Sequence, residues 1–403
     1  MTTVASVSVA DILVADDPGF ACSKSKLVSD GLLHLRPFNI EAEGGLTLIE
    51  VYRVPRSVAP RGRAVIESGD ILFNNTNSPD LVGKSALVAS QLEAGFSNHL
   101  SRLRVDRSRV IPAWFYYWLR HKAGTGFFTQ HATRWVSQAA FKTSELRRIR
   151  LELPTVEEQR RVVGLLSRAE NIIRMRREAE QKAKEIIPAL FLDMFGDPAT
   201  NPKGWGIARL GDVAEVVSGV AKGRKLGGRA TREVPYMRVA NVQAGHLNLN
   251  EMKRIPATEA EITELALQRG DVLLTEGGDH DKLGRGALLD IDIGECIHQN
   301  HVFRVRASQA SLVPEYFAAF LQTDVSRHYF LKSAKKTTNL ASINMTQLRA
   351  LPVVLPPVNL QRQFAGRASQ TKIFADDLAQ GARLARQAFE SVLAGVFSEV
   401  RAP

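Results

Sequence analysis

Leu-Pro-Thr-Val-Glu-Glu-Gln-Arg at residues 153–160 returns as Leu-Pro-Pro-Val-Asn-Leu-Gln-Arg at residues 355–362. The two copies keep Leu, Pro, Val, Gln and Arg at the same spacing, and each opens a long segment whose apolar residues recur at steps of three and four. Such steps place the apolar side chains on one face of a helix. The stretch therefore predicts the starts of two long amphipathic helices, and it divides the chain into two halves of similar design.

Other motifs repeat over nearly the same distance. Gly69-Asp70-Ile71-Leu72 returns 201 residues later as Gly270-Asp271-Val272-Leu273. A near-constant offset over such a length indicates a tandem duplication. Two similar domains in one chain can adopt a pseudo-two-fold arrangement, and homodimeric DNA-binding proteins use true two-fold symmetry to contact two half-sites. The further pairs are Leu35–Ile40 with Met237–Val242, Gly83–Leu87 with Gly284–Leu288, and Asn98–Leu100 with Asn300–Val302.

The part of each half that precedes its long helix is predicted to mix strands and helices. Residues 302–306 alternate apolar and basic side chains, which is typical of a half-exposed strand. Proline in the first turn predicts helices at residues 112–120 and 314–321. The aromatic residues of the first of these helices are expected in a core, and stacking on nucleic-acid bases is the alternative.

We therefore expect an α+β fold with two tandem-repeated, globular, mixed α/β domains separated by two long helices that pack as an antiparallel coiled coil. Pro188 is expected to kink or interrupt the first of these helices. From Val156 to Ile187 that helix would span about 48 Å, which makes it a spacer. The expected boundaries are 1–152 for the first domain, 153–200 for the central helix, 201–354 for the second domain and 355–403 for the C-terminal helix.

The composition favours a polyanionic partner. The chain holds 53 Lys and Arg against 42 Asp and Glu, which gives a net charge of +11. This surplus favours nucleic acid or an anionic membrane surface, and a merely basic soluble protein is the alternative. The two cysteines, Cys22 and Cys296, form no metal-binding pair, and no apolar run reaches 18 residues. Since the start of the chain also lacks the pattern of a signal peptide, we expect a cytoplasmic protein without a membrane span.

The sequence offers no complete catalytic or cofactor-binding motif. Gly83-Lys84-Ser85 lacks the earlier glycine of a phosphate-binding loop, because Ser78 stands there. Asp197-Pro198 and Asn201-Pro202 both lack the remainder of an adenine-methyltransferase motif. His298 and His301 are close enough in sequence to ligate a metal, but only His301 has a counterpart, His99, in the first half. We therefore predict no catalytic residue, no metal site and no cofactor bound by this chain.

Polar and basic loops at corresponding places in the two halves are the candidates for DNA contact. Lys and Arg contact phosphates, while Arg, Lys, Asn, Gln, Ser and Thr contact base edges. These loops differ between the halves although the motifs around them repeat, as expected of two domains that recognise different half-sites; solvated loops that vary without constraint are the alternative. Residues 101–150, with eleven basic and two acidic side chains, predict a backbone-binding face nearby. The candidate DNA-binding residues are Asn74, Asn75, Asn77, Lys84, Arg134, Lys222, Arg224, Lys225, Arg229, Lys282, Arg285, Lys335, Lys336, Thr337 and Asn339.

The combined order of domain, helix, domain and helix resembles the specificity subunit of type I restriction–modification systems. The resemblance rests on Leu-Pro-x-x-x-x-Gln-Arg at residues 153–160 and 355–362, and on Gly204-Trp205 followed by Leu210-Gly211-Asp212-Val213 at the start of the second half. It covers essentially the whole chain. The first half departs from the pattern at Ser8–Ile12, which lacks the Gly-Trp and Leu-Gly parts.

The resemblance implies two target recognition domains, each of which recognises one half of a bipartite site in double-stranded DNA across a fixed gap. It also implies that the helices bind two modification subunits, which carry the methyltransferase chemistry with S-adenosylmethionine, and that a motor-nuclease subunit joins for cleavage, with ATP and Mg on these partner subunits. The chain itself would be non-catalytic. Two other classes stay open from the residues alone: a coiled-coil assembly scaffold that does not recognise DNA sequence, and a self-sufficient nuclease or methyltransferase.

Overall fold

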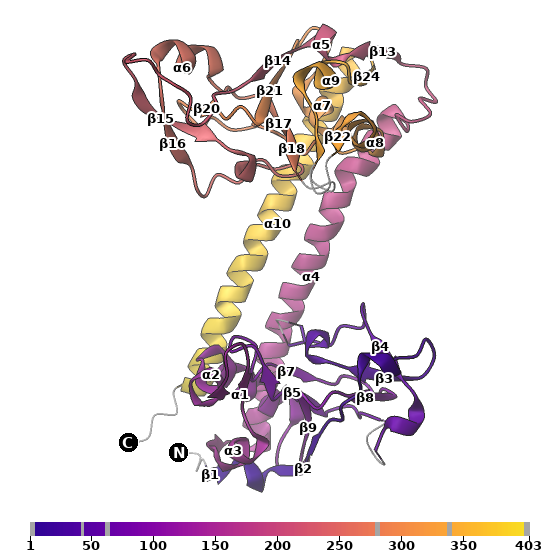
Figure 1. The fold of residues 1–403 in the computed structure, drawn as a ribbon. Helices are drawn as coiled ribbons and strands as arrows, with labels where there is room; N and C mark the ends of the chain where they lie inside the picture. The colour runs from indigo at the N-terminus through magenta and orange to yellow at the C-terminus, as the bar shows by residue number, and fades with distance from the viewer. Residues whose placement is uncertain (1–4, 42–43, 61–64, 279–282, 337–340, 399–403) are drawn as a thin grey trace. The chain divides into compact units, whose positions relative to one another are not determined.

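The computed structural model describes residues 5–41, 44–60, 65–278, 283–336 and 341–398 (Figure 1). The contacts of the chain separate into two units, one made of residues 1–176 with 381–403 and the other of residues 177–380. Each unit combines one mixed domain with a segment of each long helix, because the division falls within the helices. Within its own unit, each domain places corresponding elements in nearly the same order, as the duplication predicts.

The first unit is built around an antiparallel four-stranded sheet in the order β2–β9–β5–β7. A second sheet, in the order β4–β3–β8, pairs β3 with β4 antiparallel and with β8 in parallel. The smaller sheets are β1–β12 and β10–β11–β6. The bounds are β1 Ala5–Ser8, β2 Leu13–Pro18, β3 Leu32–Leu35, β4 Tyr52–Val54, β5 Ile71–Asn74, β6 Thr76–Asn77, β7 Ser85–Leu87, β8 Ala94–Phe96, β9 Leu100–Val105, β10 Thr133–Arg134, β11 Ala139–Ala140 and β12 Arg150–Leu153.

The helices of the first unit are α1 (Pro112–Gly124), α2 (Phe127–His131) and α3 (Thr143–Arg148), together with four short 3₁₀ turns. The aromatic residues of α1 are buried and pack in one cluster with apolar residues of the four-stranded sheet. The prediction that they belong to a core rather than to a stacking surface is confirmed. The 3₁₀ turns are η1 (Val9–Asp11), η2 (Lys24–Lys26), η3 (Pro37–Asn39) and η4 (Arg56–Val58).

The second unit repeats this plan. Its four-stranded sheet has the order β14–β21–β17–β19, and its second sheet has the order β16–β15–β20, again with one antiparallel and one parallel pairing. The strands are β13 Gly206–Arg209, β14 Ala214–Ser218, β15 Arg232–Met237, β16 Lys253–Ala257, β17 Val272–Thr275, β18 Gly277–Gly278, β19 Gly286–Leu288, β20 Ile297–His298, β21 Val302–Ala307, β22 Lys335–Lys336, β23 Ala341–Ser342 and β24 Pro352–Leu355. The shorter helices are α5 Leu210–Val213, η5 Val239–Asn241, α6 Glu259–Leu265, α7 Pro314–Phe320, α8 Asp324–Ser333 and α9 Met345–Arg349.

Two long helices follow the mixed domains, α4 (Val156–Phe195) and α10 (Val358–Ser398). α4 continues through Pro188, so of the two expected effects of this proline the interruption is wrong, and the kink stays a prediction. A proline inside a helix costs roughly 3 kcal/mol, because one hydrogen bond is lost and the ring crowds the preceding turn. Burial of Phe191, Met194 and Phe195 in the core of the second unit holds the turns that follow Pro188 and offsets this cost.

Each unit pairs opposite ends of the two helices. In the first unit, Leu166 and Ile173 from the early turns of α4 share a core with Phe389 from the last turns of α10. In the second unit, Phe191 from the last turns of α4 lies 5.8 Å, between ring centroids, from Phe364 in the second turn of α10. The helices therefore run antiparallel within each unit, and the predicted fold class is confirmed.

The glutamine of the repeated Leu-Pro-x-x-x-x-Gln-Arg motif joins each domain to its helix. Gln159 is fully buried; its Oε1 accepts from the backbone N–H of Ile111 at 2.8 Å, and its Nε2 donates to the carbonyls of Pro154 and Arg109. Gln361 makes the same three bonds, with the N–H of Val313 and two carbonyls. When both donors and the acceptor of a buried side-chain amide have hydrogen-bond partners, the side chain fits only one arrangement of the surrounding backbone. The motif therefore repeats because both halves need the same junction.

Candidate nucleic-acid interface

A cavity of about 730 Å³ lies at one end of the four-stranded sheet of the first unit. Three of the predicted residues, Asn74, Asn77 and Lys84, line it together. They come from the end of β5, from β6 and from the residue before β7. These elements are neighbours in the fold, although a long loop separates β6 from β7 in the sequence. The other lining residues are Ala21, Cys22, His34, Arg36, Pro37, Phe38, Ile40, Tyr52, Leu81, Ser97, Asn98 and His99.

One side of this cavity is aromatic and basic. The guanidinium carbon of Arg36 lies 4.4 Å from the ring centroid of Tyr52, a cation–π contact. The ring of Phe38 meets that of Tyr52 edge to face at 5.5 Å between centroids, and 44% of Phe38 is exposed. These residues come from the 3₁₀ turn η3 and from the first residue of β4. Together they form what we call the aromatic wall: Arg36, Phe38 and Tyr52.

The cavity is also lined by residues whose buried polar atoms lack a hydrogen-bond partner among the described residues: His34 Nδ1, Arg36 Nε and Asn74 Oδ1. Burial holds the pKa of His34 below its ordinary value, so the imidazole is neutral at pH 7. Its Nε2 lies 3.0 Å from the carbonyl of Phe20, which can only accept, so Nε2 carries the proton and Nδ1 is an acceptor. Unpaired buried polar atoms at a cavity point to a polar ligand.

Asn74 and Asn75 hold the loop in place rather than extend from it. Asn74 is fully buried, and its side-chain amide donates to the carbonyl of Leu81 at 3.0 Å. The amide of Asn75 donates to Ser101 Oγ at 2.8 Å. Asn77 is half-buried and its Oδ1 accepts from the N–H of Ser78. Of the predicted asparagines, Asn77 is therefore better placed than Asn75 for a ligand in the cavity.

In the second unit, the predicted basic loop before β15 is divided between two roles. Lys222, Lys225 and Arg229 are exposed. Arg224 is instead half-buried and forms a two-bond ion pair with Glu261, with both distances 2.7 Å. The hydrogen bond from Arg224 lowers the pKa of Glu261 to about 2. Arg224 therefore ties this loop to α6, which leaves the three exposed side chains as the candidates for phosphate contact.

Arg285 occupies the place in the second unit that Lys84 has in the first. The N–H of Thr275 donates to the carbonyl of Arg285, as that of Asn74 donates to the carbonyl of Lys84. The guanidinium of Arg285 donates to Gln243 Oε1 at 3.3 Å. A positive side chain therefore stands at the corresponding sheet end in each unit.

The remaining candidates lie on the small sheets β10–β11–β6 and β18–β23–β22. Arg134 on β10 is exposed and donates to the carbonyl of Thr129, and Trp135 beside it is 59% exposed. Lys335 and Lys336 form β22, which pairs with β23. Three predicted residues, Lys282, Thr337 and Asn339, lie outside the described residues.

Four of the eleven basic side chains in the stretch 101–150 form ion pairs with acidic residues. Arg102 pairs with Asp17, Arg104 with Asp70, Arg120 with Glu170 and Arg147 with Asp16. These pairs neutralise four of the positive charges and stabilise the unit, because a partly buried arginine needs a partner. The Arg104–Asp70 pair recurs in the second unit as Arg306–Asp271, which explains the repeated Gly-Asp motif.

The sequence expectations omitted Arg36, Tyr52 and His99 from the site. The available signal was repetition: Arg36 and His99 stand in motifs that recur at Arg238 and His301. No comparable signal marked Tyr52, because it reaches the cavity only through pairing of β4 with β3, opposite His34.

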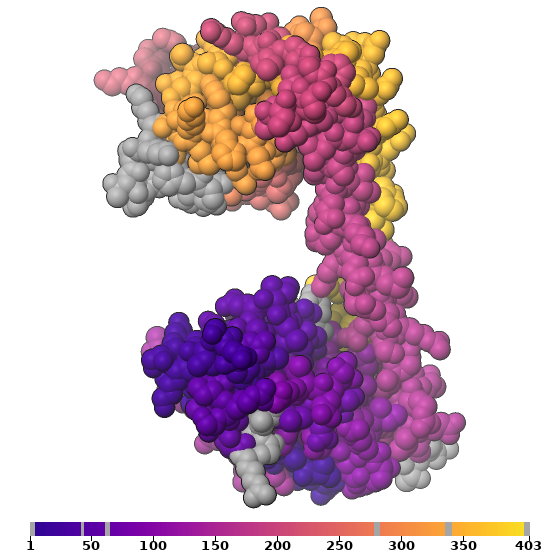
Figure 2. All heavy atoms as spheres, turned by 90° about the vertical axis from the view of Figure 1, so that its right-hand side faces the viewer, coloured from indigo at the N-terminus to yellow at the C-terminus, as the bar shows by residue number. Residues whose placement is uncertain are grey.

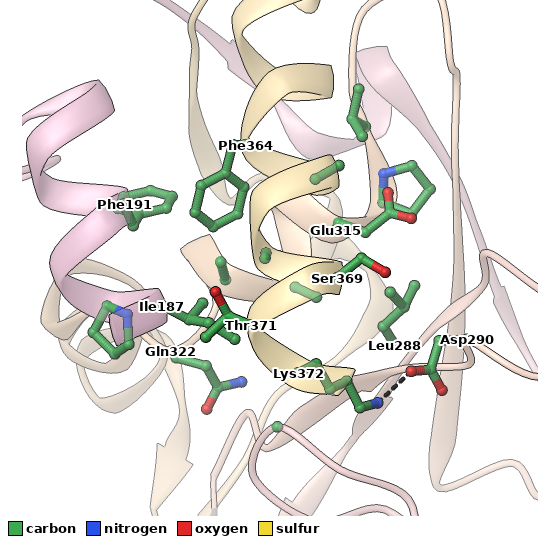
Figure 3. A pocket seen from close by; sticks show the side chains of 18 of the residues that line it. Ile187, Phe191, Leu288, Asp290, Glu315, Gln322, Phe364, Ser369, Thr371 and Lys372 are labelled. Atoms are coloured by element: carbon green, nitrogen blue, oxygen red, sulfur yellow. Dashed lines mark hydrogen bonds and ion pairs between the residues drawn. The ribbon is translucent and has the colours of Figure 1, made fainter. Parts of the chain in front are cut away.

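A larger groove of about 1890 Å³ lies within the second unit, among α4, α7 and α10 (Figure 3). Phe191 and Phe364 face each other at one end, with Ile187 below Phe191. Lys372 forms an ion pair with Asp290 at the other end. The groove thus has an apolar floor and charged edges, as a protein-binding surface does.

Apolar side chains also stand exposed along α4. Leu165, Ile172 and Ile186 follow heptad spacing and are 49%, 48% and 44% exposed, and Met175, one turn after Ile172, is 64% exposed. Figure 2 views the side on which α4 lies and shows its magenta turns uncovered there. Residues seven apart lie on one face of a helix, so these side chains form a stripe that the described parts of the chain leave open.

Neither a metal site nor a membrane span is found in the described part of the chain. No three His, Cys, Asp or Glu side chains among the described residues are grouped to hold a metal ion. His298 is fully buried with Nδ1 at 2.7 Å from the carbonyl of Val302, while His301 is exposed and bonded to Glu276. No helix of the described ranges is long and apolar enough to cross a bilayer.

Comparison with known proteins finds a family model and relatives that match parts of the chain. Residues 202–378 match the model of the type I restriction modification DNA specificity domain. The chain is similar to the type I restriction enzyme EcoKI specificity subunit of Escherichia coli K12, with 28% identity over 146 residues, which are 36% of this chain and 31% of that protein. It is 21% identical over 372 residues to the StySPI specificity subunit of Salmonella potsdam, covering 87% of this chain and 78% of that protein.

The fold agrees with a solved structure. The S subunit of a type I restriction–modification system from M. genitalium superposes with a TM-score of 0.59 at 13% identity, covering 98% of this chain and 96% of that one. The match to the E. coli subunit spans less than two thirds of its length, whereas the Salmonella and M. genitalium matches extend over most of both chains. Residues 202–378 thus match a type I restriction modification DNA specificity domain, and the chain as a whole, with its duplicated mixed domains and antiparallel helices, is similar to the specificity subunits of type I restriction–modification systems.

Proposed function

We propose that this chain recognises a bipartite sequence in double-stranded DNA and directs the methyltransferase and restriction subunits of a type I complex to it. The observation that carries the proposal is that each unit presents the same sheet end with different side chains around it. Each unit then recognises one half-site, because specificity comes from side chains while the framework sets position. The helices α4 and α10 set the gap between the half-sites.

The charge and shape of the candidate surface support contact with DNA. The chain carries a net charge of +11, and the exposed lysines and arginines of the loop before β15 lie on the second unit. The cavity of the first unit is lined by amide, imidazole and ammonium groups that match base edges and phosphates. Lys84, Asn77 and the exposed Lys222, Lys225 and Arg229 are the described residues that we assign to DNA contact.

We assign the exposed apolar stripe on α4 to the partner subunits. Two modification subunits, which carry S-adenosylmethionine, bind along the long helices, and a motor-nuclease subunit that uses ATP and Mg joins them. An apolar stripe at heptad spacing suits a partner helix or groove, because exposed apolar rows of this kind are rarely left open in a working assembly. The chain contributes no catalytic group to this assembly.

Genome-wide methylation tests the proposal directly. The host genome is sequenced by a long-read method that detects methyladenine, with and without this gene. We expect one bipartite methylated motif to disappear on deletion and to return when the gene is restored, which would also reveal both half-sites and the gap.

A binding measurement distinguishes this function from that of a scaffold. The complex with its modification subunits should bind duplexes that contain the motif more tightly than shuffled duplexes, with an affinity that falls steeply as salt rises. Equal, weak binding to both duplexes, together with an unchanged methylation pattern, would contradict the proposal and favour a coiled-coil scaffold.

A further inference from the structure

Strand pairing identifies which side chains correspond at the two sheet ends. His34 pairs with Tyr52 on β4, and its counterpart Tyr236 pairs with Lys253 on β16. Tyr52 and Lys253 therefore hold the same place in the two units. Phe38 precedes Asn39, and Ala240 precedes the corresponding Asn241, so Phe38 and Ala240 correspond as well.

These two places carry opposite chemistry. In the first unit, Phe38 and Tyr52 belong to the aromatic wall, with Arg36 over the Tyr52 ring. In the second unit, the side chain of Lys253 is 58% exposed, and Arg238, the counterpart of Arg36, lies 3.5 Å from Glu251 instead of over a ring. One sheet end thus presents flat apolar surface, and the other presents an exposed ammonium group that lies 3.7 Å from Glu251.

Two other places keep their chemistry. Lys84 corresponds to Arg285, and both are cations. His99 corresponds to His301, and each directs Nδ1 to an acceptor of its own unit: the Thr76 carbonyl at 3.2 Å and the Glu276 carboxylate at 2.5 Å. The acceptor fixes the ring in both units. In His99 it leaves Nε2 as the nitrogen that can face a ligand, whereas Nε2 of His301 lies 3.5 Å from Asn300 Nδ2.

The sugar–phosphate backbone is the same at both half-sites of a bipartite DNA motif, whereas the bases differ. Side chains that keep their chemistry between the units suit the backbone, and side chains that change suit the bases. The apolar faces of Phe and Tyr suit the methyl group of thymine, and a lysine ammonium suits the O6 and N7 acceptors of guanine.

We propose that Phe38 and Tyr52 in the first unit, and Ala240 and Lys253 in the second, determine the base preference of their half-sites. Lys84 with His99, and Arg285 with His301, contact the backbone. Tyr52 contacts a thymine-containing base pair, and Lys253 contacts a guanine. This assignment rests on the proposed function and adds to it the residues that discriminate between bases.

The test exchanges the two side chains. Tyr52→Lys and Lys253→Tyr are made separately in the full chain, and each is expressed with its partner subunits in a host that lacks other methyltransferases. The methylated motif is then read from the genome. We expect Tyr52→Lys to change one or two adjacent positions of one half-site towards guanine, with the other half-site and the gap unchanged. Lys253→Tyr should change only the opposite half-site, with loss of a guanine.

Matched controls separate base contact from backbone contact. Lys84→Arg introduces the residue that the second unit already carries, and it should leave the motif unchanged. His99→Gln and His301→Gln should lower the extent of methylation at every site without changing the motif. A motif change in either histidine variant would overturn the division of roles.

The outcomes also distinguish this inference from the function on which it rests. If the unaltered chain yields no bipartite motif, the proposed function fails. If the unaltered chain yields the motif but neither Tyr52→Lys nor Lys253→Tyr changes it, the assignment of these residues is wrong. Should Tyr52→Lys lower the melting temperature, Lys253→Tyr decides the question, because Lys253 is exposed and its replacement leaves the core intact.

Discussion

His298 shows how a position can differ between the repeats without serving the site. It is fully buried on β20, where the first unit has Phe96 on β8, and the backbone pairing of the two strands is the same. Desolvation lowers its pKa to about 4 against the opposing hydrogen bond to the Val302 carbonyl, and the nearby positive charge of Arg304 lowers the pKa further. The imidazole is therefore neutral in the folded chain at pH 7.

Acidification should destabilise the second unit through His298. The pKa is about 4 in the folded state and 6.5 in the unfolded state, so the unfolded state binds more protons between these values. The free energy of unfolding should be unaffected above about pH 6.5 and should fall on the way to pH 4, by up to about 3 kcal/mol. We expect the melting temperature to drop between pH 7 and pH 5, and His298→Phe to weaken this dependence.

A control on the protein surface separates this effect from general acid sensitivity. His328 is exposed on α8, so His328→Gln should keep the slope of the unaltered chain. An identical pH dependence in His298→Phe and in the unaltered chain would show that the titration of His298 does not couple to stability.

At the scale of elements, the long helices owe their order to both domains. Each helix starts at a buried glutamine that joins it to its own domain, and it ends in the core of the other unit. There α4 buries Phe191 and Phe195, and α10 buries Phe389 and Leu393. Most helical stability in proteins comes from tertiary packing of one face of the helix, and these two helices are packed at both ends. A change of helix length therefore moves whole domains rather than melting a segment.

Lengthening both helices together should lengthen the DNA gap. The variant carries seven extra residues after Arg176 in α4 and seven after Gln380 in α10. Both insertions fall at the division between the units, so the antiparallel pairing of the helices stays in register. Seven residues add about 10 Å of helix, which corresponds to roughly 3 base pairs. The methylated motif should keep both half-sites with a longer gap.

An insertion in α4 alone is the matched control. It shifts one helix against the other by two turns, so we expect loss of methylation rather than a new gap. A functional double insertion with an unchanged gap would refute the role of the helices as a spacer.

At the scale of the whole molecule, the proposed function assigns separate surfaces of the chain to DNA and to partner subunits. Polar and charged side chains line the cavity at a sheet end of the first unit, while a stripe of exposed apolar side chains follows one face of α4. The groove of the second unit adds a further apolar surface beside α4 and α10 (Figure 3). Because these surfaces use different residues, variants should separate the two kinds of binding.

Charges placed in the apolar stripe should prevent assembly and leave DNA recognition intact. Ile172→Glu with Met175→Glu puts two carboxylates where a partner must exclude water, at a cost of several kcal/mol in binding. We expect loss of co-purification with the modification subunits and of methylation, with an unchanged melting temperature. Gln181→Glu, an exposed position on the opposite face of α4, adds negative charge as a control and should assemble normally. Normal assembly of the double variant would exclude the stripe as the partner surface.

The sequence by itself determined the duplication, the fold class and the positions of both long helices. These features repeat as patterns along the chain, and local periodicity is enough to reveal them. The start expected at Val156 is that of α4, and the second copy of the motif, residues 355–362, contains the start of α10 at Val358. The aromatic core of α1 followed from helical spacing in the same way. The family resemblance followed from repeated motifs whose glutamine has one structural task in both halves.

The tertiary structure alone decided which polar residues are available at the site. Asn75 and Arg224 have the right chemistry for DNA, but Ser101 and Glu261, distant in sequence, engage their side chains. Tyr52 joined the site only through strand pairing. The continuity of α4 through Pro188 likewise depends on burial of the turns beyond it. The physical reason is common to all four: periodicity is a property of neighbouring residues, whereas a hydrogen-bond partner or a buried face is supplied by a segment that only folding brings near.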